Sequence, residues 1–410
     1  MRILVLNSGS SSIKYKLFDM TDRSILASGL VERIGEEPSS LKHQARSAQG
    51  EMAETCRTGR VSDHREGMRW IVEALSGSRA GQGEAELAGI GHRIVHGGED
   101  FTEPTLIDEK VLAVIRQNVP LAPLHNPANL IGIEVSLEAV PNLPQVAVFD
   151  TAFHQSIPPQ AFHYALPREM YDRYRVRRYG FHGTSHRCVA RQAATYVGRP
   201  LESLNLITLH LGNGASAAAI EKGRCVDTSM GMTPLEGLIM GTRCGDLDPA
   251  VHFYLFRETG RSPEDLDSLL NKESGLKGIC GTNDMREVLQ KAEAGDERAA
   301  LAIEMYGYRV KKYIGAYTAV LGRVDALVFT AGIGEHSSEV RECCCRGLAG
   351  LGIVLDPEKN RRPCDPPFDV QSAESRVRIL VIRTDEELEI AEQTLALTQR
   401  QEAKGQRGKR

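Results

Sequence analysis

The first candidate site is a Ser-rich turn at residues 7–12, NSGSSS, which separates two short apolar runs and is followed by Lys14. Glycine lets the backbone approach a ligand closely, and backbone N–H groups, hydroxyls and a lysine ammonium all suit phosphate oxygens. A plain β-hairpin with a polar turn explains the same residues. The stretch alone therefore leaves both interpretations open.

Further on, isolated polar side chains stand inside or directly after apolar runs. Arg93, in IGHRIVHGGE (residues 90–99), either forms an internal salt bridge or binds an anion, because arginine is rarely buried without a partner. His92 and His96 are four residues apart on a predicted strand, not on a helix, so we expect no metal site there. Asp150 follows an apolar run, which is a common active-site position in α/β sheets, although a turn or a helix cap explains it equally well.

Residues 205–223, NLITLHLGNGASAAAIEKG, repeat the plan of the N-terminus, with a polar glycine turn between two apolar runs. Two such units about two hundred residues apart favour an internal duplication. The pattern predicts two similar lobes, each with a phosphate-binding hairpin. His182 in YGFHGTSH (residues 179–186) is either a structural histidine or a donor to an anion, and Arg243 lies in a loop of small residues that could approach a ligand.

The elements that must position these residues are strands and helices in alternation. The sequence predicts helices over 68–75, from about 128, from 187, over 284–302 and 299–321, and from 384. Residues 356–378 are expected to form loops and residues 399–410 to fray. The predicted strands are 2–6, 13–18, 90–96, 144–149, 206–211, 217–221, 326–330 and 378–382.

Composition limits the class of protein. A chain of 410 residues exceeds one ordinary core, so two domains are expected. The net charge of −4 implies no basic surface for nucleic acid, and no apolar run reaches the ~20 residues that span a bilayer. The N-terminus enters a strand without a leader, which predicts no secretory signal. Nine cysteines without zinc or disulfide spacing predict reduced thiols and a cytoplasmic protein.

Taken together, these motifs resemble the acetate kinase family. Residues 5–14 (VLNSGSSSIK) resemble its first signature and residues 91–98 (GHRIVHGG) its second. The resemblance implies an α/β fold of two duplicated actin-like (ribonuclease H-like) domains around a nucleotide cleft. The first, 1–150 with 386–410, would carry a phosphate loop and the acyl site; the second, 151–385, would carry a second phosphate loop, the adenosine site and a dimer interface. Further matching stretches are 149–154, 179–186, 210–216, 227–246, 331–335 and 384–391, whereas 35–65 and 356–376 carry no motif.

The resemblance also implies roles for individual residues. Arg93 and Arg243 would flank the transferring phosphoryl group, His182 would donate to it, and Asp150 would position an arginine or the metal. Asn7 and Glu386 would hold Mg²⁺, with Mn²⁺ as an alternative, partly through water. The acyl group would contact Arg93, Val95, Leu124, Phe181 and Pro234. The nucleotide would contact Ser10, Ser12, Lys14, His210, Leu211, Gly212, Asn213, Gly214, Asp284, Met285, Arg286, Gly332, Ile333, Gly334, Glu335 and His336.

The implied reaction is a reversible in-line transfer from ATP to acetate that gives ADP and acetyl phosphate, catalysed by a homodimer. A propionate or butyrate kinase would use the same scaffold. Val95 favours acetate, but one or two additional carbon groups on the substrate change its binding free energy by only ~1–3 kcal/mol. Intact glycines at 332 and 334 disfavour a pyrophosphate-dependent relative. The charged residues of the site disfavour an actin-like nucleotide switch. His336 replaces the asparagine usual in the family, which bears on nucleotide preference.

Overall fold

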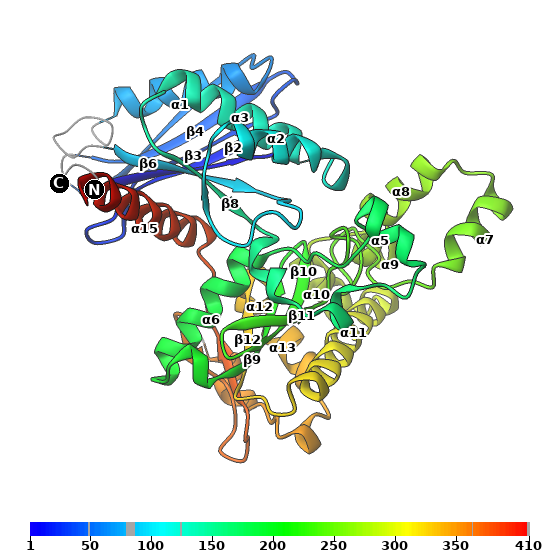
Figure 1. Ribbon diagram of the computed structural model, residues 1–410. Coiled ribbons are helices and arrows are strands. Elements are labelled where there is room, and N and C mark those ends of the chain that lie inside the picture. Colours follow the sequence, from blue (N-terminus) through cyan, green and yellow to red (C-terminus); the bar gives the residue numbers. More distant parts are fainter. Residues whose placement is uncertain (48–49, 79–86, 124, 363, 408–410) are drawn as a thin grey trace. The chain divides into compact units, whose positions relative to one another are not determined.

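The computed structural model describes residues 1–47, 50–78, 87–123, 125–362 and 364–407 (Figure 1). The chain separates into two compact units. Unit 1 comprises Met1–Ala152 and Asp385–Arg410, and unit 2 comprises Phe153–Thr384. The contacts therefore place the boundaries between the two units at 152/153 and 384/385, whereas the sequence motifs predict them at 150/151 and 385/386. Which functional sites belong to which unit stays a prediction.

The sheet of unit 1 begins with the N-terminal hairpin. Strands β1 (Arg2–Ser8) and β2 (Ser12–Asp19) pair antiparallel, and β1 also pairs in parallel with β6 (Leu87–Ile94), which in turn pairs in parallel with β8 (Gln145–Phe149). The whole order is β5-β4-β3-β2-β1-β6-β8-β7. The remaining strands are β3 (Ser24–Glu32), β4 (Ser39–Arg46), β5 (Met52–Gly59) and β7 (Thr105–Leu106).

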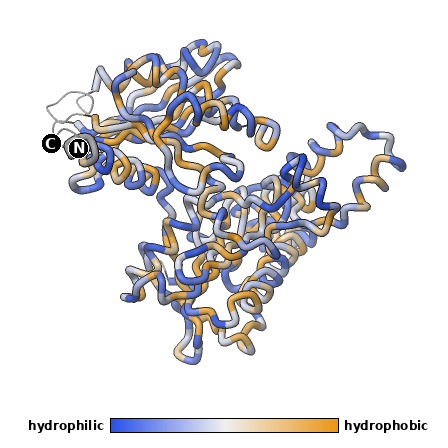
Figure 2. Tube along the Cα trace, in the orientation of Figure 1, coloured by the Kyte–Doolittle hydropathy of each residue, from blue (hydrophilic) through white to orange (hydrophobic). Residues whose placement is uncertain are grey.

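Alternating residues of β1 supply two cores in unit 1. Leu4 and Leu6 pack with α1 (His64–Gly77), which also contacts α3 (Asn126–Ala139). Ile3 and Val5 face the other way and pack with α15 (Glu386–Arg407). A strand with period two thus buries both faces between helices, and Figure 2 shows the hydrophobic segments along these elements. A third core lies under α2 (Glu109–Gln117).

The sheet of unit 2 repeats this plan. Strands β9 (Asn205–Leu211) and β10 (Ala215–Glu221) form an antiparallel hairpin, and β9 pairs in parallel with β12 (Ala326–Thr330), which pairs in parallel with β14 (Arg378–Val381). With β11 (Arg224–Thr228) and β13 (Phe368–Asp369), the order is β11-β10-β9-β12-β14-β13. This order matches β3-β2-β1-β6-β8-β7 of unit 1, which confirms the predicted duplicated α/β fold.

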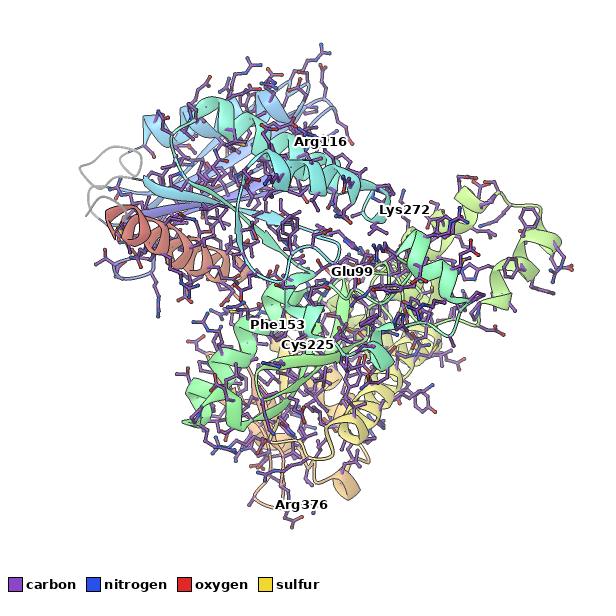
Figure 3. All side chains as sticks on the ribbon, in the orientation of Figure 1. Glu99, Arg116, Phe153, Cys225, Lys272 and Arg376 are labelled. Atoms are coloured by element: carbon purple, nitrogen blue, oxygen red, sulfur yellow. The ribbon has the colours of Figure 1, made fainter. Side chains whose placement is uncertain are left out.

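Helices cover the sheet of unit 2 as well. Helix α6 (Gly183–Val197) packs on β9 and β12, and α11 (Glu297–Leu321) packs on β10 and β9. Phe153 packs against the core that contains Cys225 (Figure 3). The other helices are α4 (Pro159–Phe162), α5 (Arg168–Tyr174), α7 (Ala250–Thr259), α8 (Pro263–Lys272), α9 (Gly275–Cys280), α10 (Met285–Glu293), α12 (Ala331–His336), α13 (Ser338–Cys345) and α14 (Pro357–Arg361). Short 3-10 turns span Val119–Leu121, Ala152–Ser156, Leu201–Ser203 and Ala349–Leu351.

Several predicted elements differ from the observed ones. The single helix expected over 284–302 is wrong: α10 ends at Glu293, Gly295 has a φ of +90°, and the Asp296 side chain caps the start of α11. The frayed end expected from residue 399 is helical to Arg407, and the loop expected over 356–378 contains α14 and β13. Helix α6 begins at Gly183, four residues earlier than expected.

Among the helices of the described residues, none combines the length and the apolar character needed to cross a membrane.

Candidate active site

Four candidate residues of unit 1 meet at one edge of the sheet. Asn7 lies near the end of β1, Arg93 near the end of β6, and Asp150 directly after β8, so the parallel order of these strands brings them together. Glu386 joins them from the start of α15. Arg93 donates to Asp150 Oδ2 from Nη2 at 2.6 Å and from Nε at 3.0 Å; its Nη1 lies 3.5 Å from Asn7 Oδ1 and its Nε 3.8 Å from Glu386 Oε2.

The charges of this cluster are strongly coupled. The side chain of Asp150 is 1% exposed, and those of Arg93 and Glu386 are 22% and 20% exposed. Burial alone would lower the pKa of Arg93, but Asp150 and Glu386 raise it above its usual value. The pKa of Glu386 is raised to about 7, mainly by burial; the positive charge of Arg93 opposes this rise, and the negative charges of Asp150 and Glu387 add to it. The site therefore carries more negative charge than Arg93 offsets.

The Ser-rich turn beside this cluster is the tip of a β-hairpin, which is one of the two interpretations that the sequence left open. The Gly9 N–H donates to the Ser12 carbonyl at 2.8 Å, and Ser10 is exposed at the tip. Lys14 forms an ion pair with Glu387 at 2.5 Å, and its side chain is about half exposed. The phosphate-binding roles of Ser10, Ser12 and Lys14 stay predictions.

Val95, which is predicted to contact the acyl group, is held by an amide that bridges two strands. Asn129 of α3 accepts the Val95 N–H at 3.2 Å and donates to the Ser8 carbonyl at 2.7 Å. Val95 is therefore fixed relative to the end of β1. Leu124, predicted for the same acyl pocket, lies outside the described residues.

In unit 2, the turn between β9 and β10 has two candidate donors above it. A Cβ atom added to Gly214 would lie 3.3 Å from Nε2 of His182 and 3.8 Å from Nη1 of Arg243. His182 precedes α6 with a φ of +57°. The turn itself is held by the Gly212 N–H to Gly214 carbonyl bond at 3.0 Å and by the Gly241 N–H to Asn213 carbonyl bond at 2.9 Å. His182 and Arg243 thus converge on Gly214, which has no side chain to fill the space between them.

Arg243 is a half-buried cation without an acidic partner among the described residues. Its Nη1 donates to the Pro234 carbonyl at 3.2 Å and approaches the Met240 sulfur at 3.7 Å. Burial lowers its pKa, and no neighbouring carboxylate opposes this effect. A guanidinium in such surroundings is suited to an anionic ligand.

A group of buried histidines lies behind His182. His182 stacks on His210 of β9 with ring centroids 4.1 Å apart, and its Nδ1 bonds to the Ser216 hydroxyl at 2.9 Å. The same hydroxyl bonds to His186 Nε2 at 2.8 Å. The sequence motifs did not single out His186 or Ser216, although they contain both. The spacing of His182 and His186 at the start of a helix was the available signal.

A cavity of about 440 Å³ in unit 2 is lined by half of the residues predicted to contact the nucleotide. Asn283, Leu289, Ser337 and Glu339, which the motifs did not predict, also line it. Gly334 is buried, and Glu335 instead accepts the Thr384 N–H at 3.2 Å and pairs with Arg383 at 3.6 Å. The predicted residues in the lining are Gly212, Asn213, Asp284, Met285, Arg286, Gly332, Ile333 and His336.

Within this lining, Asp284 has two structural roles. Its side chain caps α10 by accepting the Arg286 N–H at 2.9 Å, and it forms an ion pair with the Arg286 guanidinium at 2.6 Å. Hydrogen bonds from Arg286 lower the pKa of Asp284 to about 2. Asp284 is therefore ionised at neutral pH and fixes the start of α10 at the cavity.

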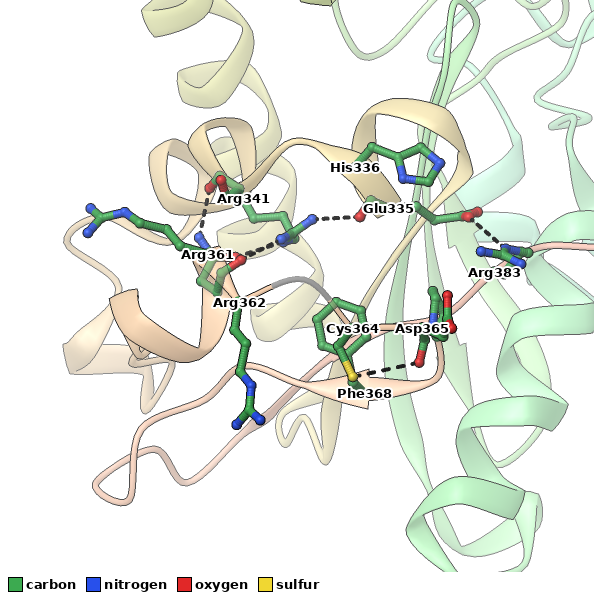
Figure 4. Close-up of a pocket in the computed structure, with 12 residues that line it drawn as sticks. Glu335, His336, Arg341, Arg361, Arg362, Cys364, Asp365, Phe368 and Arg383 are labelled. Carbon is green, nitrogen blue, oxygen red and sulfur yellow. Dashed lines mark hydrogen bonds and ion pairs between the residues drawn. The ribbon is translucent and has the colours of Figure 1, made fainter.

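A second cavity, of about 480 Å³, shares His336 with the first (Figure 4). Its buried arginine, Arg341, donates to the Gly334 and Glu335 carbonyls at 3.0 and 2.9 Å and to Asn360 Oδ1 at 2.8 Å. These bonds satisfy the C-terminal carbonyls of α12. Arg361 and Arg362 extend away from Arg383 in Figure 4. The arginines of this cavity thus serve the fold and do not converge on one point.

No group of three or more His, Cys, Asp or Glu side chains is arranged for a metal ion in the described parts of the chain.

Two copies of one sheet, a donor pair above a glycine turn and a neighbouring cavity define a two-unit α/β protein built to hold a phosphorylated ligand. The sequence matches the family model described as the Acetokinase family over residues 2–392. It is 57% identical over 403 residues to an acetate kinase of Syntrophobacter fumaroxidans, with 98% of each chain covered. The chain belongs to the acetokinase family.

Solved structures agree with this assignment. The chain superposes on Porphyromonas gingivalis acetate kinase with a TM-score of 0.91 at 43% identity, covering 96% of this chain and 99% of that one. It superposes on a propionate kinase from Francisella tularensis with a TM-score of 0.89 at 41% identity, covering 96% and 98%. Relatives that differ in acyl substrate therefore share this fold.

Proposed function

We propose that this protein transfers the γ-phosphoryl group of ATP to acetate, reversibly, giving ADP and acetyl phosphate. The observation that carries the proposal is the convergence of His182 and Arg243 over the Gly212–Gly214 turn, next to a cavity lined by the predicted nucleotide residues. Membership of the acetokinase family and the 57% identity to an acetate kinase support it.

The chemistry needs no general base, because acetate is already ionised at neutral pH. A carboxylate oxygen forms a bond to the γ-phosphorus, the bond from that phosphorus to the β–γ bridging oxygen breaks, and its electron pair leaves with ADP. Catalysis then rests on positioning and charge stabilisation. In this proposal Arg243 and His182 donate to the phosphoryl oxygens, Arg93 contacts the phosphoryl group and acetate, and Asp150 positions Arg93.

Asn7 and Glu386 are the proposed Mg²⁺ ligands, with Mn²⁺ as an alternative ion. One amide oxygen and one carboxylate fit Mg²⁺, which usually keeps several waters and phosphate oxygens as its other ligands. Two carboxylates, those of Asp150 and Glu386, face the one guanidinium of Arg93 in this cluster, and this arrangement supports a cation at this position. When bound, the ion would neutralise charge on the phosphates.

Acetate is proposed as the preferred acyl group because a residue smaller than Val95 would be needed to admit a longer chain. In unit 2, Phe181 and Pro234 are the residues predicted to contact the acyl group. Phe181 is 3% exposed, and its carbonyl accepts from His154 Nε2 at 2.9 Å, so its position is fixed. Propionate is the second candidate, because the identity to the Francisella tularensis propionate kinase is 41% and that to the Porphyromonas gingivalis acetate kinase is 43%.

We also propose a cytoplasmic homodimer that assembles through unit 2. Helix α7 has no buried residue and exposes Phe253, Tyr254 and Phe256, whose side chains are 66%, 57% and 51% exposed. Tyr308 of α11 is 64% exposed. Such clustered aromatic exposure is typical of interaction surfaces. Light scattering after gel filtration should give twice the chain mass, and Phe253→Ser with Phe256→Ser should reduce it to one.

The test of the activity is acyl phosphate formation, trapped with hydroxylamine, in the presence of ATP and Mg²⁺. Acetate, propionate and butyrate are compared at equal concentration. A clear preference for acetate supports the proposal in full, and equal or better use of propionate keeps the mechanism but changes the substrate. No product from any of the three, in a folded protein that binds ATP, contradicts it.

A further inference from the structure

A chain of hydrogen bonds runs through the core of unit 2 to His182. It begins at the Thr208 hydroxyl on β9, which lies 2.7 Å from Nδ1 of His186. Nε2 of His186 lies 2.8 Å from the Ser216 hydroxyl, and that hydroxyl lies 2.9 Å from Nδ1 of His182. Thr208, His186 and Ser216 are all fully buried.

Which group donates in each of these hydrogen bonds follows from the number of hydrogens that each group carries. The only partner of the Thr208 hydroxyl within the described residues is His186 Nδ1, so the hydroxyl hydrogen has no other acceptor and must be donated there. His186 Nδ1 is then an acceptor. Burial holds the pKa of His186 well below its usual value, so the ring is neutral and its one hydrogen is on Nε2.

The same reasoning assigns the donor and the acceptor in the hydrogen bond between Ser216 and His182. His186 Nε2–H donates to the Ser216 oxygen, so the Ser216 hydrogen must point to its other partner, which is Nδ1 of His182. Nδ1 of His182 is therefore an acceptor, and its hydrogen is on Nε2. Nε2 is the atom that faces the Gly214 turn together with Arg243.

We propose that His186, with Thr208 and Ser216, positions the hydrogen of His182 so that the neutral ring presents an Nε2–H donor at the Gly214 turn. The assignment of the tautomer stands on the hydrogen bonds alone; its catalytic consequence rests on the proposed phosphoryl transfer. His186 is thus a positioning residue, and His182 is the residue that contacts the phosphoryl group.

The arrangement also disfavours the doubly protonated form of His182. A hydrogen on Nδ1 would leave the Ser216 oxygen facing two donors, and the Ser216 hydrogen would lose its acceptor. Among the described residues, Arg243, His210 and His186 lie near His182, and none of these three is an acid. A neutral donor beside Arg243 avoids placing two cations together.

The experiment is ¹⁵N NMR of the imidazole nitrogens in the full-length enzyme, with His182 assigned by its loss in His182→Gln. The expected result at pH 7 is a neutral ring with a bare Nδ1 and a protonated Nε2. Ser216→Ala should give both tautomers of His182 and lower kcat roughly tenfold with little change in KM. His186→Gln, whose amide N–H can still reach Ser216, should restore the single tautomer that His186→Leu loses. Thr195→Val, a substitution of an exposed hydroxyl on the same helix, is the matched control.

Each outcome is decisive. A protonated Nδ1 in the wild-type protein overturns the proposal, as does lost activity in Ser216→Ala with an unchanged tautomer. The expected tautomer without acyl phosphate formation from any substrate would contradict the proposed function and leave the hydrogen-bond assignment standing. If His186→Leu does not fold, Ser216→Ala and His186→Gln still decide the question.

Discussion

In unit 1 the end of β6 carries Arg93, whose charge is paired with the buried Asp150 next to Glu386. In unit 2 the hairpin in the equivalent position to β1–β2 faces Arg243 and His182, and no carboxylate among the described residues pairs with that arginine. Both hairpins pair antiparallel, and they take equivalent positions in the strand order of their sheets. The duplicated backbone is therefore compatible with opposite electrostatics at the strand ends.

This difference suits the two units to different ligands of a phosphoryl-transfer reaction. A cluster with excess negative charge suits a divalent cation, and a cluster of donors without acids suits the phosphate oxygens themselves. The two arginines should also differ in how much they contribute to stability and to activity. An arginine that neutralises a buried acid contributes to both, whereas an arginine without such a partner contributes mainly to ligand binding.

The largest expected effect is that of Arg93→Ala. Activity should fall by ~10²–10³ because a donor to the phosphoryl group is lost. Stability should also fall, by about 3 kcal/mol, because Asp150 is left as a buried carboxylate without its partner. Urea unfolding and kcat measured on one preparation test both. Adding Asp150→Ala should recover stability but not activity; a single variant as stable as wild type would argue against the ion pair.

Arg243→Ala should lose a comparable factor of ~10²–10³ in kcat but unfold near the wild-type midpoint. Within the described residues its guanidinium contacts the Pro234 carbonyl and the Met240 sulfur and no carboxylate, so its removal leaves no buried acid of that part of the chain unpaired. Arg346→Ala, which removes an exposed arginine of the same unit, is the control. Near-normal turnover of Arg243→Ala would remove it from the site.

Acid should weaken both units through buried histidines. Burial lowers the pKa of His92 in unit 1 to about 4 and that of His186 in unit 2 well below its usual value. The unfolded chain binds these protons from about pH 6.5 downward, before the folded one does, so stability is complete above that pH and falls toward pH 4. For His92 the loss at pH 5 is about 2 kcal/mol. In His92→Phe the difference in urea midpoint between pH 7 and pH 5 should shrink; an unchanged difference would rule His92 out as a cause.

A smaller effect is expected from the acyl pocket. Val95→Ala should raise the propionate-to-acetate ratio of kcat/KM about tenfold, because the smaller side chain leaves room for one more methylene. Ile94→Val is a matched control, since Ile94 is fully buried in the core under α2. It should leave that ratio unchanged. The same shift in both variants would mean that Val95 does not contact the acyl group.

The smallest effect is expected at His336, which is exposed where the two cavities of unit 2 meet. His336→Asn should change the KM for ATP by roughly twofold, as exposed substitutions alter free energies by about 0.5 kcal/mol. Comparing ATP with GTP in both proteins tests purine preference. A change above tenfold in either nucleotide would mean that His336 contacts the base directly.

The sequence predicted those features that short segments encode. Apolar runs located β1, β2, β6, β8, β9, β10, β12 and β14, and the repeated turn predicted the duplication. Strands β3–β5 were missed: β5 has no buried residue, and two of the four buried positions of β4 are the polar residues Ser39 and His43, so neither strand shows an apolar run. The partner of Arg93 was left open because Asp150 is 57 residues away. The link from His186 to Ser216 spans 30 residues and likewise appears only once the strands are paired.

The most direct test of the central claim follows the oxygen atoms of acetate. Acetate labelled with ¹⁸O in both oxygens is incubated with the enzyme, ATP and Mg²⁺, and the product is trapped with hydroxylamine, which attacks the acyl carbon and releases phosphate. If a carboxylate oxygen attacks the γ-phosphorus, the released phosphate must contain one ¹⁸O atom, and Arg243→Ala should release it at a far lower rate. Phosphate without ¹⁸O would mean that water is the acceptor, and the account of this protein as an acetate-phosphorylating enzyme would be wrong.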